Sequence, residues 1–318
     1  MTKQIKKPLY MTIHDFHKHS HVGWDNSLKP IAEVDSGEII NFEVVDASGG
    51  QFTKDSTSKV IEEIDFAKVN PTVGPVYVKG AEPGDTLEVE FLDFRQLDWG
   101  WTAVIPGFGL LADDFKDPEI KIYDLKDRKR AEFLHGIDLF IKPFPGTIGV
   151  ALPEDGLFNV VPPRKNGGNM DIRHLTKGAK LYLPVWVEGA LFSIGDTHAA
   201  QGDGEVCGTA IEASMDTTIK FKLHKGKTIQ EPRFELSGPP TPEADSKGYF
   251  VTTAQSPDVF EASQNAIRYM IEHLSKEYKI SEEEAYMLCS TAVDLKIHEI
   301  VNMPNYGVSA FLPKVIFK

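Results

Sequence analysis

The segment Thr86-Leu87-Glu88-Val89-Glu90-Phe91 decides the fold class, because apolar and acidic side chains alternate along it. A period of two is typical of a β-strand with one buried and one polar face. The preceding Glu82-Pro83-Gly84-Asp85 is a turn, in which glycine accepts a positive φ without a steric clash. The same layout, a glycine-containing turn followed by an apolar strand, recurs at residues 35–45 and 176–187. We therefore expect a protein built mainly from short strands.

Further strands are predicted at residues 76–79, 139–142, 191–194 and 218–223. Many short strands separated by glycine- and proline-containing turns are typical of a sandwich or a barrel. The first 250 residues are therefore predicted to be mainly β.

The C-terminal quarter follows a different pattern. Apolar side chains at helical spacing predict a helix over residues 258–278. Ser281 and Glu284 form a capping box at the start of a second helix, whose apolar stripe runs to Ile297. We expect Glu299 at the end of that helix, Pro304 to stop it, and a strand-like tail at 310–317.

The proline-rich stretch 237–242 is the best candidate for a linker. The sequence thus predicts a mainly β fold with an α+β C-terminal part. Residues 1–240 would form a β-rich sandwich or barrel that carries the catalytic residues. Residues 241–318 would form a smaller α/β region with two helices.

Charge and cysteine content narrow the choice of partners. The net charge of −13 disfavours nucleic acid and anionic membranes, which carry phosphate groups, and permits a small neutral substrate. Two cysteines are too few for a disulfide framework and indicate a reducing, cytoplasmic compartment. No apolar run has the length of a signal peptide or a membrane span, so no membrane association is expected.

The run from Phe192 to Thr209 is the richest in chemically useful side chains. Asp196 and His198 are two residues apart, so on an extended chain they share a face and could bind a divalent metal such as zinc. Glu205 follows a Gly-Asp-Gly turn and could act as the general base toward a water molecule. The alternative is a glycine-rich polar hairpin without catalytic function.

A second run, residues 166–173, places Asn169 and Asp171 after paired glycines, which allow the backbone to approach a ligand closely. Asp171 is a candidate metal ligand, or a residue that holds one in place. The alternative is an Asn-Gly-Gly turn with a surface carboxylate.

Four histidines lie within residues 14–21, and histidine is a common metal ligand. Histidines near a terminus are often solvated, and His21 is the one we expect near the site. It adjoins Trp24, which could wall a pocket, and Asn26, which offers a polar group.

Two residues keep open alternatives. Cys207 shares a strand face with Glu205 and could be a thiolate nucleophile, although a buried core cysteine is commoner and no lysine or histidine is adjacent to lower its pKa. Glu299 could be an ordinary helix-end residue, or its neighbouring loop 302–306 could pack near the site.

Seven segments, spread in order over nearly the whole chain, resemble the acetamidase/formamidase family. They are residues 21–26, 70–76, 143–149, 163–171, 183–190, 195–212 and 303–308. Together they are far more specific than any single motif.

The resemblance implies a jelly-roll-like β-sandwich, a homo-dimer or higher homo-oligomer, and hydrolysis of a short carboxamide such as formamide or acetamide. It also implies a divalent metal, zinc in preference to calcium. Carried over by motif, the site residues are His21, Asn169, Asp171, Asp196, His198 and Glu205. We expect Glu205, His198 and Asn169 to be catalytic, and Asp171, Asp196 and His198 to bind the metal. His21, with the neighbouring Trp24 and Asn26, is expected to bind substrate.

The mechanism expected from these residues is attack by a metal-activated water that Glu205 deprotonates, with Glu205 then passing the proton to the leaving ammonia. Two alternatives remain at this point. One is a small-ligand-binding β-sandwich with a structural metal, and the other is a thiol-dependent amidase that uses Cys207.

Overall fold

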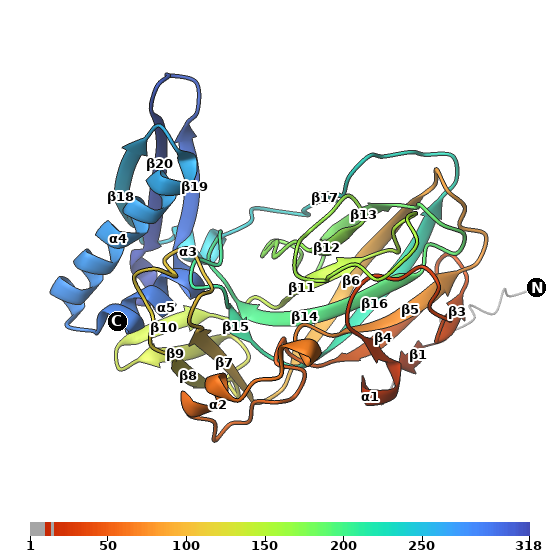
Figure 1. Ribbon diagram of the computed structural model, residues 1–318, viewed down its shortest axis with the longest axis horizontal. Helices are drawn as coiled ribbons and strands as arrows, with labels where there is room; N and C mark the ends of the chain where they lie inside the picture. Colours follow the sequence, from red (N-terminus) through yellow and green to blue (C-terminus); the bar gives the residue numbers. More distant parts are fainter. Residues whose placement is uncertain (1–9, 14–15) are drawn as a thin grey trace, which may run out of the picture.

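The computed structural model describes residues 10–13 and 16–318. Its main part consists of two large sheets that face each other (Figure 1). The first sheet contains, in spatial order, β1 (Tyr10–Ile13), β4 (Ile39–Val44), β16 (Met215–His224), β6 (Thr86–Gln96), β13 (Lys180–Pro184) and β17 (Arg233–Glu235). The second contains β12 (Gly167–Asn169), β11 (Phe144–Gly149), β14 (Phe192–Ala200), β15 (Ile211–Glu212), β7 (Trp99–Val104) and β8 (Glu119–Asp124), while β5 (Thr72–Val78) pairs with β14, β2 (Ser20–His21) and β3 (Ala32–Val34).

The space between the sheets holds one hydrophobic core. Leu87, Val89 and Phe91 of β6 are fully buried there, as the alternating segment predicts. Phe144 of β11 and Phe192 of β14 enter the same core from the second sheet. The mainly β prediction is therefore confirmed, and the sheets form a sandwich because neither closes on itself.

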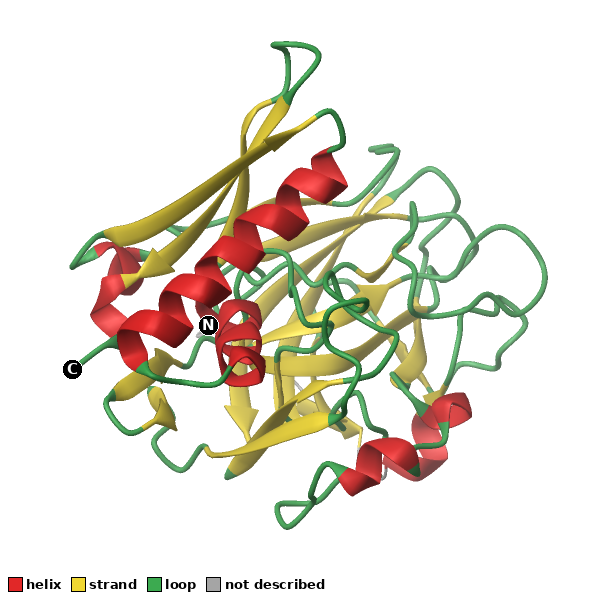
Figure 2. Ribbon diagram, turned by 60° about the vertical axis from the view of Figure 1, so that its left-hand side comes forward, coloured by secondary structure: helices red, strands yellow, loops and turns green. Residues whose placement is uncertain are grey.

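The C-terminal part combines a three-stranded sheet with two helices. Figure 2 shows the long helix α4 (Val259–Tyr278) lying against the sheet of β18 (Tyr249–Ser256), β20 (Tyr306–Pro313) and β19 (Asp294–Glu299). The second helix, α5 (Glu282–Ala292), begins with the predicted capping box. The smaller elements are α1 (Phe16–His19), α2 (Lys59–Glu62), η1 (Phe66–Lys68), β9 (Arg130–Leu134), β10 (Ile137–Phe140), α3 (Pro242–Asp245) and η2 (Lys314–Ile316).

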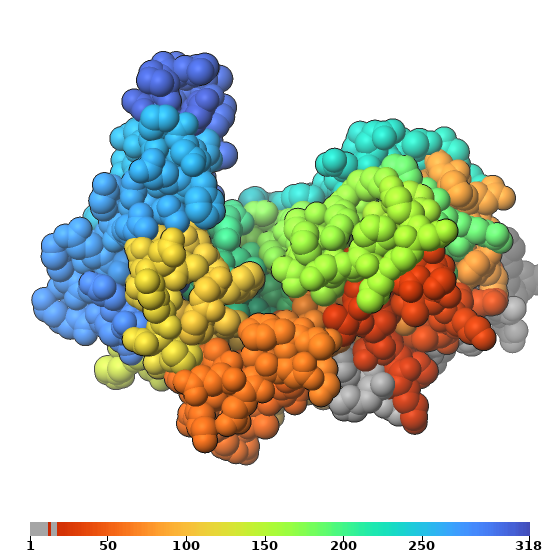
Figure 3. Space-filling model, viewed as in Figure 1, coloured from red at the N-terminus to blue at the C-terminus, as the bar shows by residue number. Residues whose placement is uncertain are grey.

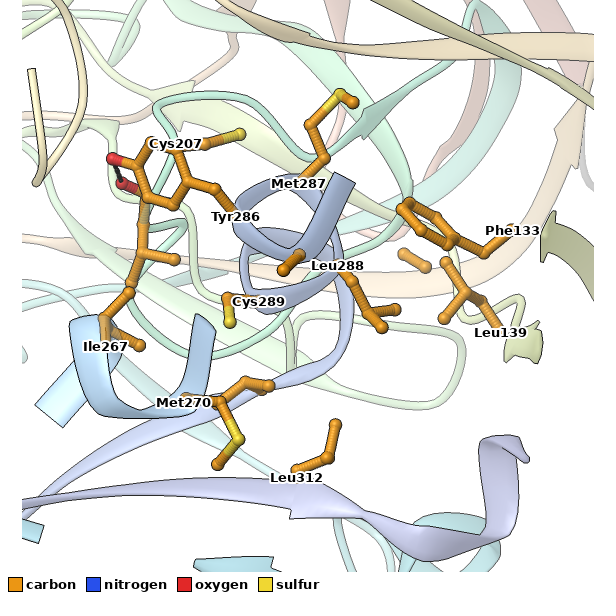
Figure 4. Packing of buried hydrophobic residues seen from close by; sticks show 14 of the residues in the cluster. Phe133, Leu139, Cys207, Ile267, Met270, Tyr286, Met287, Leu288, Cys289 and Leu312 are labelled. Atoms are coloured by element: carbon orange, nitrogen blue, oxygen red, sulfur yellow. Dashed lines mark hydrogen bonds between the residues drawn. The ribbon is translucent and has the colours of Figure 1, made fainter. Parts of the chain in front are cut away.

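A second hydrophobic core joins the C-terminal helices to the rest of the chain. Figure 4 shows Met270 of α4 and Leu288 of α5 packed together with Phe133, Leu139 and Cys207. The predicted division at residue 240 stays a prediction, and this core contains residues from both sides of it. Figure 3 shows that the molecular surface is hollowed between the C-terminal part and the sandwich.

The end of the last helix was predicted wrongly. Helix α5 ends at Ala292, and the residues predicted to extend it form β19, whose backbone groups pair with β20. Ile297 is 58% exposed, so its apolar side chain belongs to a strand face and not to a buried helical stripe. Glu299 ends β19 and accepts hydrogen bonds from the backbone of Val301 and Asn302, which makes it a turn residue. The last strand also begins before residue 310, at Tyr306.

None of the helices in the described part of the chain combines the length and the apolar character that a bilayer crossing demands.

Candidate active site

Strand β14 carries the centre of the candidate site, and its neighbours in the sheet add further polar side chains. In the ladder with β11, Phe144 lies opposite His198 and Thr147 opposite Gly195. On the next strand Asn169 lies opposite Thr147, and on the other side of β14 Glu212 lies opposite His198. Strand pairing therefore gathers residues that are far apart in sequence.

His198 lies among the carboxylates. Its Nε2 is 3.0 Å from Oδ1 of Asp196, 3.3 Å from Oε2 of Glu212 and 3.9 Å from Oε1 of Glu205. The side chains of His198, Asp196 and Glu212 are at most 5% exposed. The pair predicted from its two-residue spacing is thus in contact and buried.

Two neutral polar side chains contact the other carboxylate oxygen of Asp196, and a third, Asn169, contacts both of them. Asn70 donates to Oδ2 at 3.3 Å, and the Thr147 hydroxyl lies at the same distance from it. Thr147 also lies 2.6 Å from Oδ1 of Asn169, to which Asn70 donates at 3.2 Å. The Oδ1 of Asn169 is thereby occupied, which leaves its amide nitrogen for another acceptor.

The loop that carries Glu205 is held by the C-terminal part. Gly202 donates its backbone N–H to Ser290 at 2.8 Å, and Asp203 donates to the carboxylate of Asp294 at 3.1 Å. A side chain at Gly202 would meet the backbone oxygen of Val293 at 2.1 Å, so only glycine fits against the C-terminal part here. The position of Glu205 therefore depends on docking of the α5–β19 junction.

Backbone strain is concentrated among the residues that surround Asp196 and His198. Seven non-glycine residues of the described chain have positive φ, a conformation that is uncommon for residues with a Cβ. Four of them belong to the centre: Asn70, Asp171, Asp196 and Glu205. Such conformations cost about 1–3 kcal/mol each and persist where the surrounding structure enforces them, often at functional sites.

Burial and mutual repulsion shift the pKa values of the acids. Burial, together with the charge of Asp196, raises the pKa of Asp171 to about 6. Burial is also the main reason why the pKa of Glu212 rises to about 8 and that of Glu205 well above its usual range. For Asp196 burial acts in the same direction, but the charge and hydrogen bond of His198 outweigh it and lower the pKa.

The charge balance points to a bound cation. Four carboxyl groups face one imidazole, and buried charges of one sign are costly unless they are protonated or paired with a cation. Two triplets bring one ligand atom from each residue within 4.8 Å: Asp171, Asp196 and His198, and His198, Glu205 and Glu212. Oδ1 of Asp171 and Oε2 of Glu212 are buried without a hydrogen-bond partner among the described residues.

Gly146 leaves space beside the first triplet. A Cβ at this position would lie 2.5 Å from Oδ1 of Asp171, 2.8 Å from Oδ2 of Asp196 and 2.8 Å from Cε1 of His198. The lack of a side chain thus lets three atoms of candidate metal ligands lie close to the backbone of residue 146. The residues present fit a small divalent cation with nitrogen and oxygen ligands.

Comparisons with known proteins identify the family of this chain. The Acetamidase/Formamidase family profile matches residues 9–160 and 155–318. The chain belongs to this family. It is 30% identical over 376 residues to a formamidase from Methylophilus methylotrophus, covering 94% of this chain and 89% of the relative.

Two solved structures are also similar. A γ-lactamase from Delftia acidovorans matches with a TM-score of 0.89 at 27% identity, covering 97% of this chain and 93% of that one. An acetamidase from Bacillus halodurans matches with a TM-score of 0.68 at 32% identity, covering 96% and 97%.

In this acetamidase/formamidase family member, the residues predicted to bind substrate have other partners. Nδ1 of His21 lies 2.8 Å from the backbone oxygen of Gly23, and Nε2 lies 2.9 Å from Oγ of Ser193. Trp24 is 2% exposed and packs in a small core, while Asn26 donates to the carbonyl of Leu152 at 3.2 Å. Among the described contacts, none links these three residues to the carboxylates around His198. Their contacts instead hold the segment that precedes β3 in place. His14 lies outside the described residues.

Several residues of the candidate site were not singled out from the sequence. These are Asn70, Gly146, Thr147, Gln201 and Glu212, all of which lie inside or beside segments that resemble the family. Ordinary polar residues and a glycine carry no signal of their own, so only their place in those segments could have indicated them.

The surroundings of Cys207 bear on the alternative of a thiol-dependent amidase. Its thiol is fully buried, contacts the backbone oxygen of Ala103 and the residue Thr209, and has its pKa raised by burial. Nucleophilic cysteines need the opposite shift, because the thiolate is the reactive form. We expect Cys207→Ala to keep more than half of the wild-type kcat, measured as ammonia release. Complete inactivation of a folded variant, with a trapped acyl-thioester in the wild type, would establish the thiol route.

Proposed function

We propose that this protein hydrolyses short carboxamides to ammonia and a carboxylate. The observation that carries the proposal is the buried centre of Asp171, Asp196, His198, Glu205 and Glu212, found on a family framework whose named relatives include formamidase and acetamidase. Enzymes place acids with shifted pKa values where protons must be moved, and in this centre the pKa values of three acids are raised.

Glu205 is the proposed general base. Its side chain is 15% exposed, more than those of Asp196, His198 and Glu212, so it lies toward the side from which water can enter. A carboxylate whose pKa is raised by burial accepts a proton from water more readily than an ordinary glutamate. The same group can then donate that proton to the leaving nitrogen.

Asn169 and His198 are the proposed partners of the substrate and the base. The free amide nitrogen of Asn169 can donate to the substrate carbonyl oxygen, because its own oxygen is held by Thr147 and Asn70. In the metal-free protein, the charge and hydrogen bond of His198 lower the pKa of Asp196 and keep it ionised. The substrate-binding role of His21, Trp24 and Asn26 stays a prediction, and their observed contacts hold the neighbouring segment in place.

Asp171, Asp196 and His198 would hold a divalent metal, with zinc favoured over calcium because one ligand is an imidazole nitrogen. A metal bound there would supply positive charge that acidifies a water molecule and polarises a carbonyl.

Metal affinity is expected to depend on pH. A cation held by Asp171 must displace the proton that this acid binds with a pKa of about 6, and its charge would favour loss of the proton from nearby Glu212, whose pKa is about 8. We therefore expect zinc affinity to rise between pH 5.5 and 8.5, by up to ~10-fold per pH unit for each proton released. Competition with a chromophoric chelator measures it, and an affinity that stays flat or falls with pH would contradict the assignment.

The same shifts have a consequence for stability. Because the folded-state pKa values of these acids are raised, the metal-free folded state binds more protons than the unfolded chain. The stabilisation that comes from this extra proton binding is present at low pH. It is lost as pH rises through the folded-state pKa values of about 6 and about 8. The Tm of chelator-treated protein should fall over this range, relative to protein loaded with zinc.

The experiment that tests the function is an ammonia-release assay. Purified protein is incubated with formamide, acetamide, propionamide and benzamide, and its metal content is determined. We expect turnover of the two smallest amides at least tenfold above that of benzamide. Absence of ammonia release from every amide, by protein with a full metal complement, would favour a ligand-binding module instead.

A γ-lactam is the second candidate substrate. The TM-score with the γ-lactamase is 0.89, against 0.68 for the acetamidase, although the acetamidase is closer in sequence. A lactam is an amide closed into a ring, so the same base and carbonyl donor would act on it, and the ring nitrogen would stay attached to the product. Hydrolysis of 2-pyrrolidinone without ammonia release, followed by chromatography of the amino acid, distinguishes the two.

We also propose a cytoplasmic homo-oligomer. Both cysteines are free and buried, which suits a reducing compartment. The β19–β20 hairpin exposes Ile300, Val301 and Met303, and apolar side chains gathered in this way are typical of a protein contact. Light scattering of the purified protein measures the subunit number.

A further inference from the structure

The two ring nitrogens of His198 face different surroundings. Nε2 points to the carboxylates of Asp196 and Glu212, whereas Nδ1 lies 2.9 Å from the side-chain oxygen of Gln201. Gln201 is 5% exposed, so water does not compete freely for this contact. In the neutral ring, the group that Gln201 presents to Nδ1 therefore decides which nitrogen carries the proton.

The orientation of the Gln201 amide is set by a second contact. Its Nε2 lies 2.9 Å from the backbone carbonyl oxygen of Asp171, and a carbonyl can only accept a hydrogen bond. The amide nitrogen must therefore face Asp171, which turns the amide oxygen toward His198. Because that oxygen also only accepts, Nδ1 of His198 must donate.

We infer that Gln201 is a positioning residue that holds a proton on Nδ1 of His198 and so reserves Nε2 for the carboxylate side. A histidine in a metal or proton-transfer site works through one nitrogen, and the partner of the other nitrogen selects it. Gln201 does this while also bonding to the backbone of Asp171, so a single amide links two strained segments of the centre.

The surroundings keep Gln201 and the imidazole in place. Arg173 donates to the backbone oxygen of Gln201 at 3.1 Å and is paired with the buried carboxylate of Asp294. The ring of Phe144 meets the His198 ring edge-on, with 5.1 Å between centroids. A ring flip of His198 would place its carbon atoms against the Gln201 oxygen, so the observed orientation is the one that the contacts support.

A neutral amide suits this position better than the carboxylate that often orients a histidine. Four carboxyl groups already surround Nε2 and the neighbouring space, and a fifth would add to their repulsion. A carboxylate would also place an acceptor against the carbonyl of Asp171, where a donor is required.

Nitrogen NMR of the whole protein, labelled with 15N at histidine only, tests the inference. The His198 signals are identified by their absence in His198→Gln. We expect the wild type to show a proton on Nδ1 that exchanges slowly with water. Gln201→Met should lose that protected proton signal, because methionine offers no comparable acceptor. Gln201→Glu should keep it, because an acceptor remains beside Nδ1.

The matched control is Gln51→Met, since Gln51 also accepts from one backbone group, Asp65, and donates to another, Ser48, near α2. It should leave the His198 signals unchanged. A wild-type Nδ1 without a proton, or an unchanged protected signal in Gln201→Met, would overturn the inference. If Gln201→Met does not fold, a wild-type spectrum without a proton on Nδ1 still overturns the inference.

The catalytic consequence rests on the proposed function and is measured separately. Both Gln201 variants should lower kcat about 10- to 100-fold with a smaller change in KM, because they disturb orientation and not substrate contact. If the amide assay fails for the wild type while the NMR result holds, the proposed function is wrong and the role of Gln201 stands. The reverse outcome would leave amide hydrolysis intact and remove Gln201 from its orienting role.

Discussion

Replacing Glu205 with glutamine is expected to lower kcat for amide hydrolysis by about 10²- to 10⁴-fold, the usual effect of removing a general base. Glutamine fills nearly the same volume but cannot take the proton of water. Glu205 faces His198 from 3.9 Å and lies in a loop anchored by its own backbone and the C-terminal part, so the substitution should not move the other groups.

The variant should also retain its fold and its zinc. Burial and the nearby charge of Asp171 raise the pKa of Glu205, so an uncharged replacement relieves repulsion in the metal-free protein. Its Tm after chelation should equal or exceed that of the wild type at pH 8. The control is Glu62→Gln, at an exposed position on α2. Wild-type turnover by a folded, metal-loaded Glu205→Gln protein would remove Glu205 from the mechanism.

Replacing Gly146 with alanine is expected to lower zinc affinity at least ~100-fold, although it adds only one methyl group. The added Cβ would lie 2.5 Å from Oδ1 of Asp171 and 2.8 Å from Oδ2 of Asp196, closer than such atoms approach. The carboxylates would have to move away from residue 146, and so out of the arrangement in which they could share a metal. Second-sphere disturbances already cost 10- to 100-fold in affinity, and this change displaces the ligands themselves.

The matched control is Gly238→Ala, because no atom lies within 4 Å of a Cβ built there. It should bind zinc and turn over substrate as the wild type does. Zinc binding is measured by chelator competition, and the circular dichroism spectrum confirms that the Gly146→Ala protein is folded. Undiminished zinc affinity in a folded Gly146→Ala protein would show that the metal lies elsewhere.

The secondary structure was predictable where the signal is local. Alternation at residues 86–91 predicted a strand, and Ser281 with Glu284 predicted a helix start, because both patterns depend on neighbours a few residues away. The helix end was missed, since residues 294–299 have a mixed pattern and become a strand only by pairing with β20. Tertiary pairing there outweighs local preference.

The candidate site was predictable only in part. Asp196 and His198 were paired because of their spacing, yet β14 is not regular there: Asp196 has a φ of 51°, and the ladder with β15 shifts after His198. Asp171, Asn169 and Glu205 were also expected, and the structure brings all of them to the same centre. The substrate-binding role of His21 stays a prediction, because a histidine near a tryptophan has the same sequence pattern whether it binds substrate or holds a loop in place.

The sequence by itself determined the β-rich architecture, the acidic surface charge, and the family segments that contain the reactive side chains, because these are properties of composition and short-range order. Only the tertiary structure decided which of those side chains meet. Asn70, Gly146, Gln201 and Glu212 gain their roles from strand pairing and loop docking across distances of up to 142 residues, from Asn70 to Glu212. Their contacts depend on register and backbone strain, which arise only when the sheets are assembled.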